Sequence, residues 1–424
     1  MVIIISCHCL FTGILVRIEM QGMVILSCWV LGALQGAILI LVPEMMLQGQ
    51  LSALQLALPL SFGTFIFLYC SGRWGKLLDE RYSTNKSILS IFRWALLGFF
   101  ISQLSFLLLL QLSSFQGVVL LIALCASRIL HGLFCSAIIP SAQLTLSRND
   151  KKGEKLVWSS IAINIGRLTA PLLTFVTIDI TYFSLWFIVG VTLLATIIAW
   201  SGKEKLNIKP DVSNQQSFIV TGNQNERFAF FTNPLLLSVC SAALLVSLFS
   251  SQLQFSLGPL LLAKLSNADL ARQLTASLLF CASLSALISL FILYRPLSRS
   301  PKLFLSVITI CLIVGCYLFA TQQHLFVAIT LISAALSMAP TWYSALAIHA
   351  SKQNKARTSA AVSQGHTLGN AFGGLVGGGL LVFGQTALLL SFIFLMVFIL
   401  LAWSVVYRQS NRTNNVLSST VKTT

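Results

Sequence analysis

The sequence predicts an all-α integral membrane protein with twelve transmembrane helices in two bundles of six. Three observations lead to this prediction. The 424 residues are 56% apolar and only 9% charged, whereas soluble domains carry about a quarter charged residues. Long apolar runs alternate with clusters of basic residues, and a polar stretch over residues 201–233 divides the chain near its middle. A chain of this kind uses lipid as its solvent.

The net charge of +16 does not indicate a nucleic-acid partner, because the basic residues are not gathered on one stretch with stacking aromatics. They fall in six clusters separated by apolar runs, as Lys and Arg do in the cytoplasmic loops of membrane proteins. The clusters hold 21 of the 27 Lys and Arg residues. They are Arg73, Lys76, Arg81 and Lys86; Arg148, Lys151, Lys152 and Lys155; Lys203, Lys205, Lys209 and Arg227; Arg295, Arg299 and Lys302; Lys352, Lys355 and Arg357; and Arg408, Arg412 and Lys422.

The chain between consecutive clusters is long enough for two crossings, since one crossing takes about 20 residues as a helix. Residues 303–351 and 358–407 contain no formal charge, and residues 94–147 contain only Arg128. Two crossings before each of six clusters give twelve, with every cluster on the cytoplasmic side. The expected helices cover residues 24–42, 52–71, 88–111, 117–140, 157–177, 182–200, 234–256, 272–294, 303–320, 325–347, 358–383 and 385–407.

These helices predict a domain organisation with both termini in the cytoplasm. Residues 1–22 form an N-terminal extension, and translation from Met20 or Met23 is an open alternative for its origin. Residues 23–200 form the first bundle, 201–233 a cytoplasmic linker, 234–407 the second bundle and 408–424 a cytoplasmic tail. The cell membrane, that is the inner or cytoplasmic membrane, is the expected location.

No cofactor or metal site is expected. Most of the ten cysteines lie inside apolar stretches, where a thiol acts as a small hydrophobe. The segment Cys7-His8-Cys9 lacks a second pair of ligands that would complete a tetrahedral site. The sequence also lacks clustered catalytic acids or a phosphate-binding loop, which disfavours the alternative of a membrane-embedded transferase.

The two halves resemble each other weakly. Pro140 is followed twelve residues later by Lys152, and Pro340 is followed at the same distance by Lys352. Repeats of this kind, with the solute site at their interface, underlie alternating access in many transporters. Small residues follow in the next helix of each half, and their spacing predicts close helix packing, either static or sliding. They are Gly166 to Pro171 in the first half and Gly365, Gly369, Gly373, Gly374 and Gly377 in the second, with Gly32 and Gly36 on the first helix.

Ionisable groups inside the predicted helices are the candidate site residues, because a charge within the bilayer is costly. Arg128, His131 and Arg167 lie in the first half, Glu44 follows Pro43 at the outer end of the first helix, and His366 lies in the eleventh. Two arginines and at most one carboxylate predict a positive cavity that binds an anion, since guanidinium pairs with carboxylate by two parallel hydrogen bonds. Glu44, His131 and Arg128 are the candidates for proton coupling. Structural roles for Arg128, Arg167 and both histidines are the alternatives.

The loop after the second helix carries Gly75, Asp79 and Arg81. This run resembles the loop signature of the major facilitator superfamily, in which the aspartate meets a helix N-terminus and basic neighbours in a cytoplasmic latch. Glu80 and Tyr82 depart from the signature, which usually has arginine and glycine there. The resemblance implies a gate that opens when the halves separate.

Two further segments are similar to motifs of that superfamily. Arg128 to Gly132, followed by Pro140, resembles its arginine and glycine segment on the fourth helix. Gly166 to Pro171 resembles the antiporter motif on the fifth helix, with Ala170 in place of the central glycine. The resemblance covers essentially the whole chain and is closest to the drug and siderophore efflux branches. It implies that Gly132, Gly166, Pro171, Gly369 and Gly373 serve packing or conformational change.

The resulting expectation is a monomeric, proton-coupled exporter of a small anionic or amphipathic solute, siderophore-like or drug-like. Import of a metabolite or iron chelate on the same fold is the alternative, which the altered helix-five motif permits. Lys264 and Asp269 are expected to form a solvated charge pair in the outer loop before the eighth helix.

Overall fold

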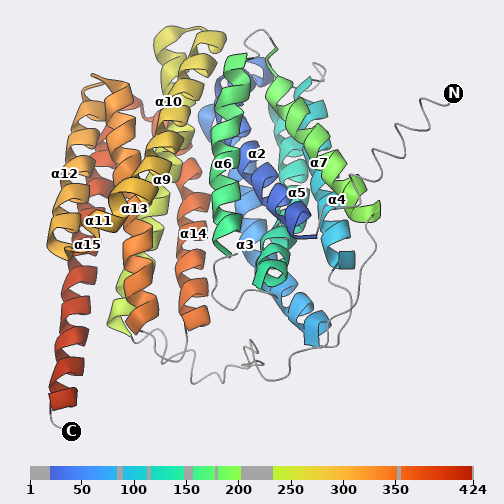
Figure 1. Ribbon diagram of the computed structural model, residues 1–424. Coiled ribbons are helices and arrows are strands. Elements are labelled where there is room, and N and C mark those ends of the chain that lie inside the picture. Colours follow the sequence, from blue (N-terminus) through green and yellow to red (C-terminus); the bar gives the residue numbers. More distant parts are fainter. Residues whose placement is uncertain are drawn as a thin grey trace. The chain divides into compact units, whose positions relative to one another are not determined.

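The computed structural model describes residues 20–83, 89–111, 116–147, 156–176, 180–201, 233–350 and 355–422. The regular elements of these residues are all helical (Figure 1). Ten of the described helices are long and apolar enough to cross a membrane. In chain order the elements are α2 (Met20–Gly49), α3 (Ala53–Ser83), α4 (Leu89–Gln111), α5 (Gly117–Ser147), α6 (Leu156–Val176), α7 (Phe183–Ser201), α9 (Pro234–Leu265), α10 (Ala268–Ile288), η2 (Ser289–Leu293), α11 (Tyr294–Leu297), α12 (Pro301–Ala320), α13 (Leu325–Ala350), α14 (Lys355–Val382) and α15 (Gln385–Lys422).

The chain divides into two compact units. Unit 1 comprises the described residues of Met1–Leu51, Phe62–Gln216 and Ala268–Ala276. Unit 2 comprises those of Ser52–Ser61, Ser217–Asn267 and Ser277–Thr424. The first turns of α3 therefore belong to unit 2, and the first turns of α10 belong to unit 1.

Helix α2 is longer than the sequence predicts, because it continues through Pro43 to Gly49 instead of ending at residue 42. Membrane helices tolerate an internal proline where neighbouring groups satisfy the freed carbonyl. Helix α3 then begins with a capping box. The Ser52 amide donates to Gln55 Oε1 at 2.8 Å, and the Gln55 amide donates to Ser52 Oγ at 3.2 Å.

The eighth predicted helix is not uniform. It runs as α10 to Ile288, widens into the π-helix η2 over Ser289–Leu293 and closes with α11. Ser289 Oγ lies 2.9 Å from Ser337 Oγ of α13, and Ser285 Oγ donates to the Thr330 carbonyl at 2.8 Å. These hydrogen bonds fix the wide turn against α13.

Helices α2 and α6 cross in unit 1 where both carry glycine. A β-carbon on Gly32 would lie 1.9 Å from the carbonyl oxygen of Ile163, and one on Gly166 would lie 2.1 Å from that of Trp29. The two backbones touch, as small residues allow in membrane helices. The Trp29 indole also donates to Thr169 Oγ1 at 3.2 Å. This crossing fixes the middle of α6 against α2.

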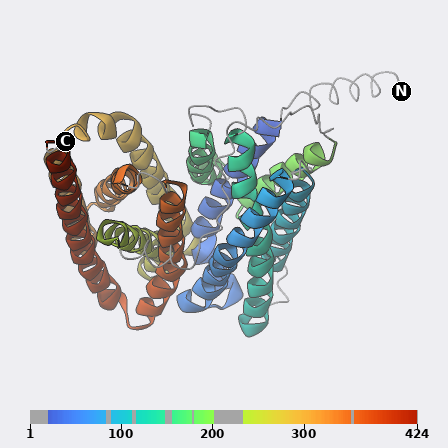
Figure 2. The same cartoon turned by 90° about the horizontal axis from the view of Figure 1, so that it is seen from below.

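Helices α9 and α14 make the corresponding crossing in unit 2, where they lie side by side (Figures 1 and 2). A β-carbon on Gly369 would lie 2.3 Å from the Leu244 carbonyl oxygen, and one on Gly373 would lie 2.5 Å from that of Leu248. The first and fifth helices of each predicted half are thus in close backbone contact at glycine residues. Of the other small residues, Gly132 faces the Gly63 carbonyl of α3.

Several predicted features lie outside the described residues. They include Cys7-His8-Cys9, the linker residues 202–232 and the side chain of Asp79. Helix α15 extends to Lys422, so the segment that follows the predicted end at residue 407 is helical.

Candidate functional site

Arg167 lies in the middle of α6, a short apolar helix. Its Nε and Nη2 atoms donate to Oε1 of Gln35 on α2, at 3.1 and 2.9 Å. Both side chains are exposed, although most of α2 around Gln35 is buried. The glycine crossing below them holds the two helices at the separation that this pair needs. Gln35 therefore orients the fork of Arg167 and leaves Nη1 free of hydrogen bonds to other described residues.

Gln35 was not among the residues predicted from the sequence. An uncharged amide matches no family motif, and its partner lies 132 residues away. The signal that could have found it is an amide in the middle of a long apolar span, because such a side chain needs a polar partner in the membrane.

Arg128 lies on α5 and is only 9% exposed. Its guanidinium carbon sits 5.8 Å from the centre of the Phe106 ring of α4, and Gly63 of α3 leaves room for the side chain. Within the described part of the chain, Nε has no hydrogen-bond partner and no carboxylate forms an ion pair with Arg128. A buried guanidinium without a carboxylate leaves a fixed positive charge in a low-dielectric setting.

Replacement of Arg128 by alanine is expected to abolish solute flux while the protein still inserts into the membrane. The substitution removes a fixed charge from the contact between α5, α4 and α3. Flux into vesicles, normalised to the inserted protein, measures the effect. An Arg128→Lys variant, which keeps the charge, is the control, and full transport by the alanine variant would remove Arg128 from the site.

His131 is one turn from Arg128 and packs against α4. Its ring centre lies 5.2 Å from that of Phe99, and its Nδ1 has no hydrogen-bond partner among the described residues. The structure thus places Arg128 and His131 on neighbouring turns of one helix. Glu44, the third predicted coupling residue, forms no hydrogen bond or ion pair with either of them in the described part of the chain.

Glu44 belongs to a polar cluster at the C-terminal end of α2 in unit 1. The Tyr182 hydroxyl donates to Gln48 Oε1, and Gln48 Nε2 donates to Glu44 Oε1 at 2.5 Å. The Glu44 carboxylate interacts electrostatically with Asp269 and Arg272 at the start of α10. Burial raises the pKa of the Tyr182 phenol and nearby Glu44 raises it further, so the hydroxyl keeps its proton and remains a donor.

The predicted pair of Lys264 and Asp269 is not formed. Asp269 Oδ1 instead accepts from Arg272 Nη2 at 2.9 Å, and Lys264 Nζ donates to Gln322 Oε1 at 3.4 Å. The reason is geometric. Asp269 and Arg272 are three residues apart on α10 and therefore face each other, whereas Lys264 lies in the last turn of α9. Arg272 is 2% exposed. The sequence analysis did not select it as a site residue, because it is the first residue of the predicted helix 272–294 and not inside the span.

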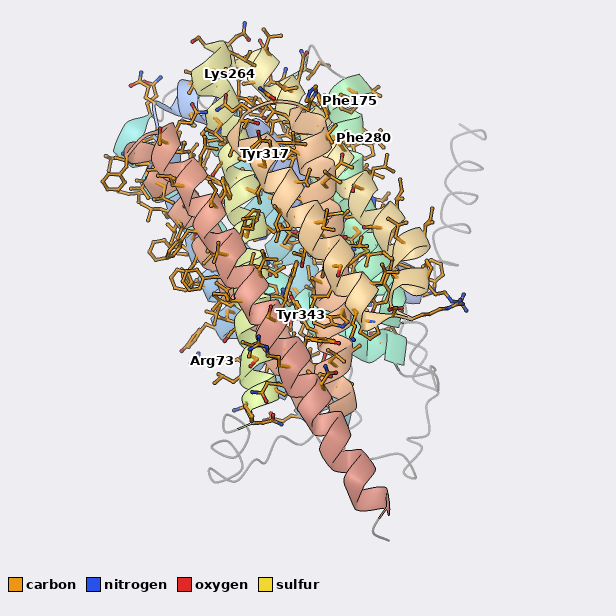
Figure 3. All side chains as sticks on the ribbon, turned by 90° about the vertical axis from the view of Figure 1, so that its left-hand side faces the viewer. Arg73, Phe175, Lys264, Phe280, Tyr317 and Tyr343 are labelled. Carbon is orange, nitrogen blue, oxygen red and sulfur yellow. The ribbon has the colours of Figure 1, made fainter. Side chains whose placement is uncertain are left out.

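His366 lies in unit 2 and is held at both ring nitrogens. Its Nδ1 is 2.5 Å from Ser247 Oγ of α9, and its Nε2 is 3.2 Å from the Tyr343 hydroxyl of α13. The Tyr343 ring stacks on the imidazole with centres 5.9 Å apart. Tyr343 lies farther from the Lys264 end of unit 2 than Tyr317 does (Figure 3). The hydroxyls can each donate or accept, so the network holds either tautomer.

Replacement of His366 by leucine is expected to lower the thermal stability of the detergent-solubilised protein, because the buried Tyr343 hydroxyl loses its partner at a cost of about 1–3 kcal/mol. The double variant His366→Leu, Tyr343→Phe is expected to regain part of that loss, since both polar partners are then gone. Equal stability of the wild type and the single variant would show that this hydrogen bond contributes nothing.

The predicted cytoplasmic gate is only partly described. Arg81 lies in the last turn of α3, and its Nη1 donates to Ser90 Oγ of α4 at 2.7 Å. A β-carbon on Gly75 would meet no atom within 4 Å, so close packing does not require glycine there. The role of Asp79 remains a prediction.

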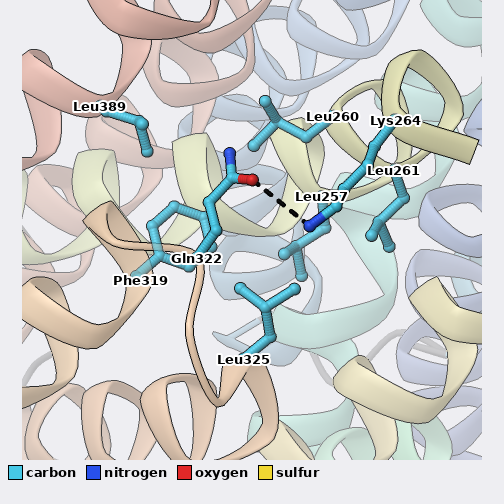
Figure 4. Close-up of a pocket in the computed structure, with 8 residues that line it drawn as sticks. All are labelled: Leu257, Leu260, Leu261, Lys264, Phe319, Gln322, Leu325 and Leu389. Atoms are coloured by element: carbon cyan, nitrogen blue, oxygen red, sulfur yellow. Dashed lines mark hydrogen bonds between the residues drawn. The ribbon is translucent and has the colours of Figure 1, made fainter.

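A small apolar pocket in unit 2 is separate from these residues (Figure 4). Its polar groups are Lys264 and Gln322, which bond to each other. The lining residues are Leu257, Leu260, Leu261, Lys264, Phe319, Gln322, Leu325 and Leu389.

Comparison with known proteins finds no matching family model and no matching curated sequence. Solved structures do match over nearly the whole chain. A bacterial homologue of the human lysosomal transporter Spinster, inward-facing and occupied, has a TM-score of 0.67 at 13% identity and covers 92% of this chain and 96% of its own. The D-xylose–proton symporter has a TM-score of 0.69 at 13% identity, with coverages of 91% and 96%. A bacterial homologue of the iron transporter ferroportin, outward-facing, has a TM-score of 0.62 at 16% identity, with coverages of 93% and 100%.

At sequence identities of 13% and 16%, the similarity to these structures establishes the fold alone. The chain is a multi-pass, all-helical membrane protein with the fold of major-facilitator-type transporters. The compared proteins are transporters and not enzymes, and they include inward-facing and outward-facing structures of one protein.

Proposed function

We propose that the chain is a secondary transporter that moves a small organic anion across the membrane by alternating access. Twelve transmembrane spans are proposed, with α6 and α14 added to the ten apolar helices. The bundles are residues 23–200 and 234–407, joined by the cytoplasmic linker 201–233. Both termini lie in the cytoplasm, the location is the cytoplasmic membrane and the active form is a monomer.

The observation that carries the proposal is the pair of membrane-embedded guanidiniums in unit 1. Arg167 is exposed and oriented by Gln35, whereas Arg128 is buried. Neither forms an ion pair with a carboxylate of the described residues. Their positive potential favours an anion, and Arg167 offers the hydrogen-bonding fork that carboxylates fit. Arg167 is the proposed contact residue, and Arg128 supplies fixed charge.

Protons are the proposed coupling ion, and export is the proposed direction. Glu44 can take up a proton at the outer end of α2, and one compared structure is named as a proton symporter. The substrate class is a siderophore-like or drug-like carboxylate. Import of a metabolite or iron chelate remains the alternative direction for the same site.

Purified protein in sealed vesicles tests the proposal. A proton gradient is imposed in each direction, and flux of citrate, 2,3-dihydroxybenzoate and uncharged glycerol is measured. Gradient-dependent flux of an anion, absent for glycerol and reduced for the Arg167→Ala variant at low anion concentration, is the expected result. The gradient direction that drives accumulation separates exchange from symport. Anion flux that does not depend on the proton gradient in either direction would contradict proton coupling. Absence of anion flux would contradict the transport proposal.

A further inference from the structure

Helix α14 carries an unusual exposed face for a membrane helix. Ser363, Gln364 and Asn370 are exposed, and Thr367 is half-buried. Ser363, Thr367 and Asn370 follow one another at spacings of four and three residues, which places them on one side of a helix. The glycine side of α14 faces α9 instead. A polar stripe therefore runs along the side of α14 that α9 does not cover.

A second side of α14 is apolar and partly exposed. Leu368, Phe372 and Leu375 have the same four and three spacing, and Phe372 is 43% exposed. This side suits lipid tails. Exposed side-chain amides are unfavourable in contact with lipid tails, because hydrocarbon cannot satisfy their hydrogen bonds. The segregation of the two exposed sides indicates that the polar stripe borders water within the membrane.

The side-chain amides of Gln364 and Asn370 form no hydrogen bonds to other described residues. The Thr367 hydroxyl donates to the Ser363 carbonyl at 3.0 Å, which leaves its oxygen able to accept. No formal charge occurs in residues 358–407. The stripe thus offers uncharged donors and acceptors side by side, a set that matches hydroxyl groups.

We propose that Ser363, Gln364, Thr367 and Asn370 form a binding surface in unit 2 for a hydroxyl-rich part of the solute. The transported anion is then a hydroxylated carboxylate and not an aliphatic one. An aliphatic ligand would leave the amides unpaired, and sites built for hydrogen bonds reject such ligands strongly. This inference rests on the proposed function and names the substrate class of the transporter.

Cysteine labelling tests the water-lined face without requiring flux. Ser363→Cys and Thr367→Cys are near-isosteric, and Phe372→Cys on the lipid side of the same helix is the matched control. The variants are placed in lipid nanodiscs and treated with a charged methanethiosulfonate. Peptide mass spectrometry follows each position, so the native cysteines stay in place. Labelling at 363 and 367 is expected to be about tenfold faster than at 372, since the reaction needs a hydrated thiolate. Equal rates would overturn the proposal.

Protection by ligands tests the recognition of hydroxyls. Gluconate and hexanoate are six-carbon carboxylates that differ in their hydroxyls, and sorbitol is an uncharged relative of gluconate. Gluconate is expected to slow labelling of Thr367→Cys several-fold, whereas hexanoate has no effect. Asn370→Leu, added to that variant, is expected to abolish the difference. Protection by hexanoate, or by no ligand, would overturn the proposal. Full protection by sorbitol would support the hydroxyl surface and contradict anion selectivity, which separates this inference from the proposed function.

Discussion

Replacement of Arg167 by alanine is expected to weaken the apparent affinity for the transported anion by about 10- to 100-fold, because a charged hydrogen bond contributes roughly 1.5–3 kcal/mol. The guanidinium is already oriented by Gln35, so little side-chain ordering is needed on binding. The concentration dependence of flux into vesicles measures the change.

Two control variants separate charge from geometry. Arg167→Lys keeps the positive charge but loses the planar fork, so an intermediate affinity is expected. Gln35→Leu keeps the guanidinium but frees it to rotate, and a smaller loss than that of Arg167→Ala is expected. Wild-type affinity in the alanine variant would show that Arg167 is a packing residue that does not touch the solute.

Replacement of Gly32 by alanine is expected to have the largest effect on folding. The added methyl would lie 1.9 Å from the Ile163 carbonyl oxygen, and that atom belongs to a helix backbone that cannot rotate away. Forced overpacking costs typically about 1–3 kcal/mol, and more where backbones collide. We expect a strongly reduced yield of monodisperse protein and a lower unfolding temperature in detergent.

Gly75→Ala is the matched control, because a β-carbon at Gly75 would meet nothing within 4 Å. It is expected to leave yield and unfolding temperature unchanged. If both alanine variants behaved like the wild type, α2 and α6 could separate without loss, and the crossing would not be a fixed contact.

The sequence was sufficient for the helical class and for most helix positions, because charge is costly in lipid and basic loops mark the ends of crossings. It was less informative about helix ends. Pro43 suggested an end at residue 42, yet α2 continues to Gly49. The π-helix η2 was also unforeseen, since its hydrogen bonds to Ser337 and its neighbours depend on packing against α13.

The sequence predicted the ionisable residues of the candidate site but not the residues that form hydrogen bonds with them. Arg128, Arg167 and His366 stand out because ionisable groups are rare in apolar spans. Gln35, Ser247 and Tyr343 are ordinary residues there, and their importance arises only when distant helices meet. Periodicity within one helix cannot supply such contacts, so the sequence alone could not assemble the site.

The uneven placement of charge has an electrical consequence. The described helices of unit 2 carry no formal charge between residues 303 and 350 or from 358 to 407, whereas those of unit 1 carry Arg128 and Arg167. Displacing one elementary charge through the full transmembrane potential changes the energy by about 2.3 kcal/mol per 100 mV. Any voltage sensitivity of transport should therefore originate in unit 1, and a bound monovalent anion would cancel about half of the charge on those two arginines.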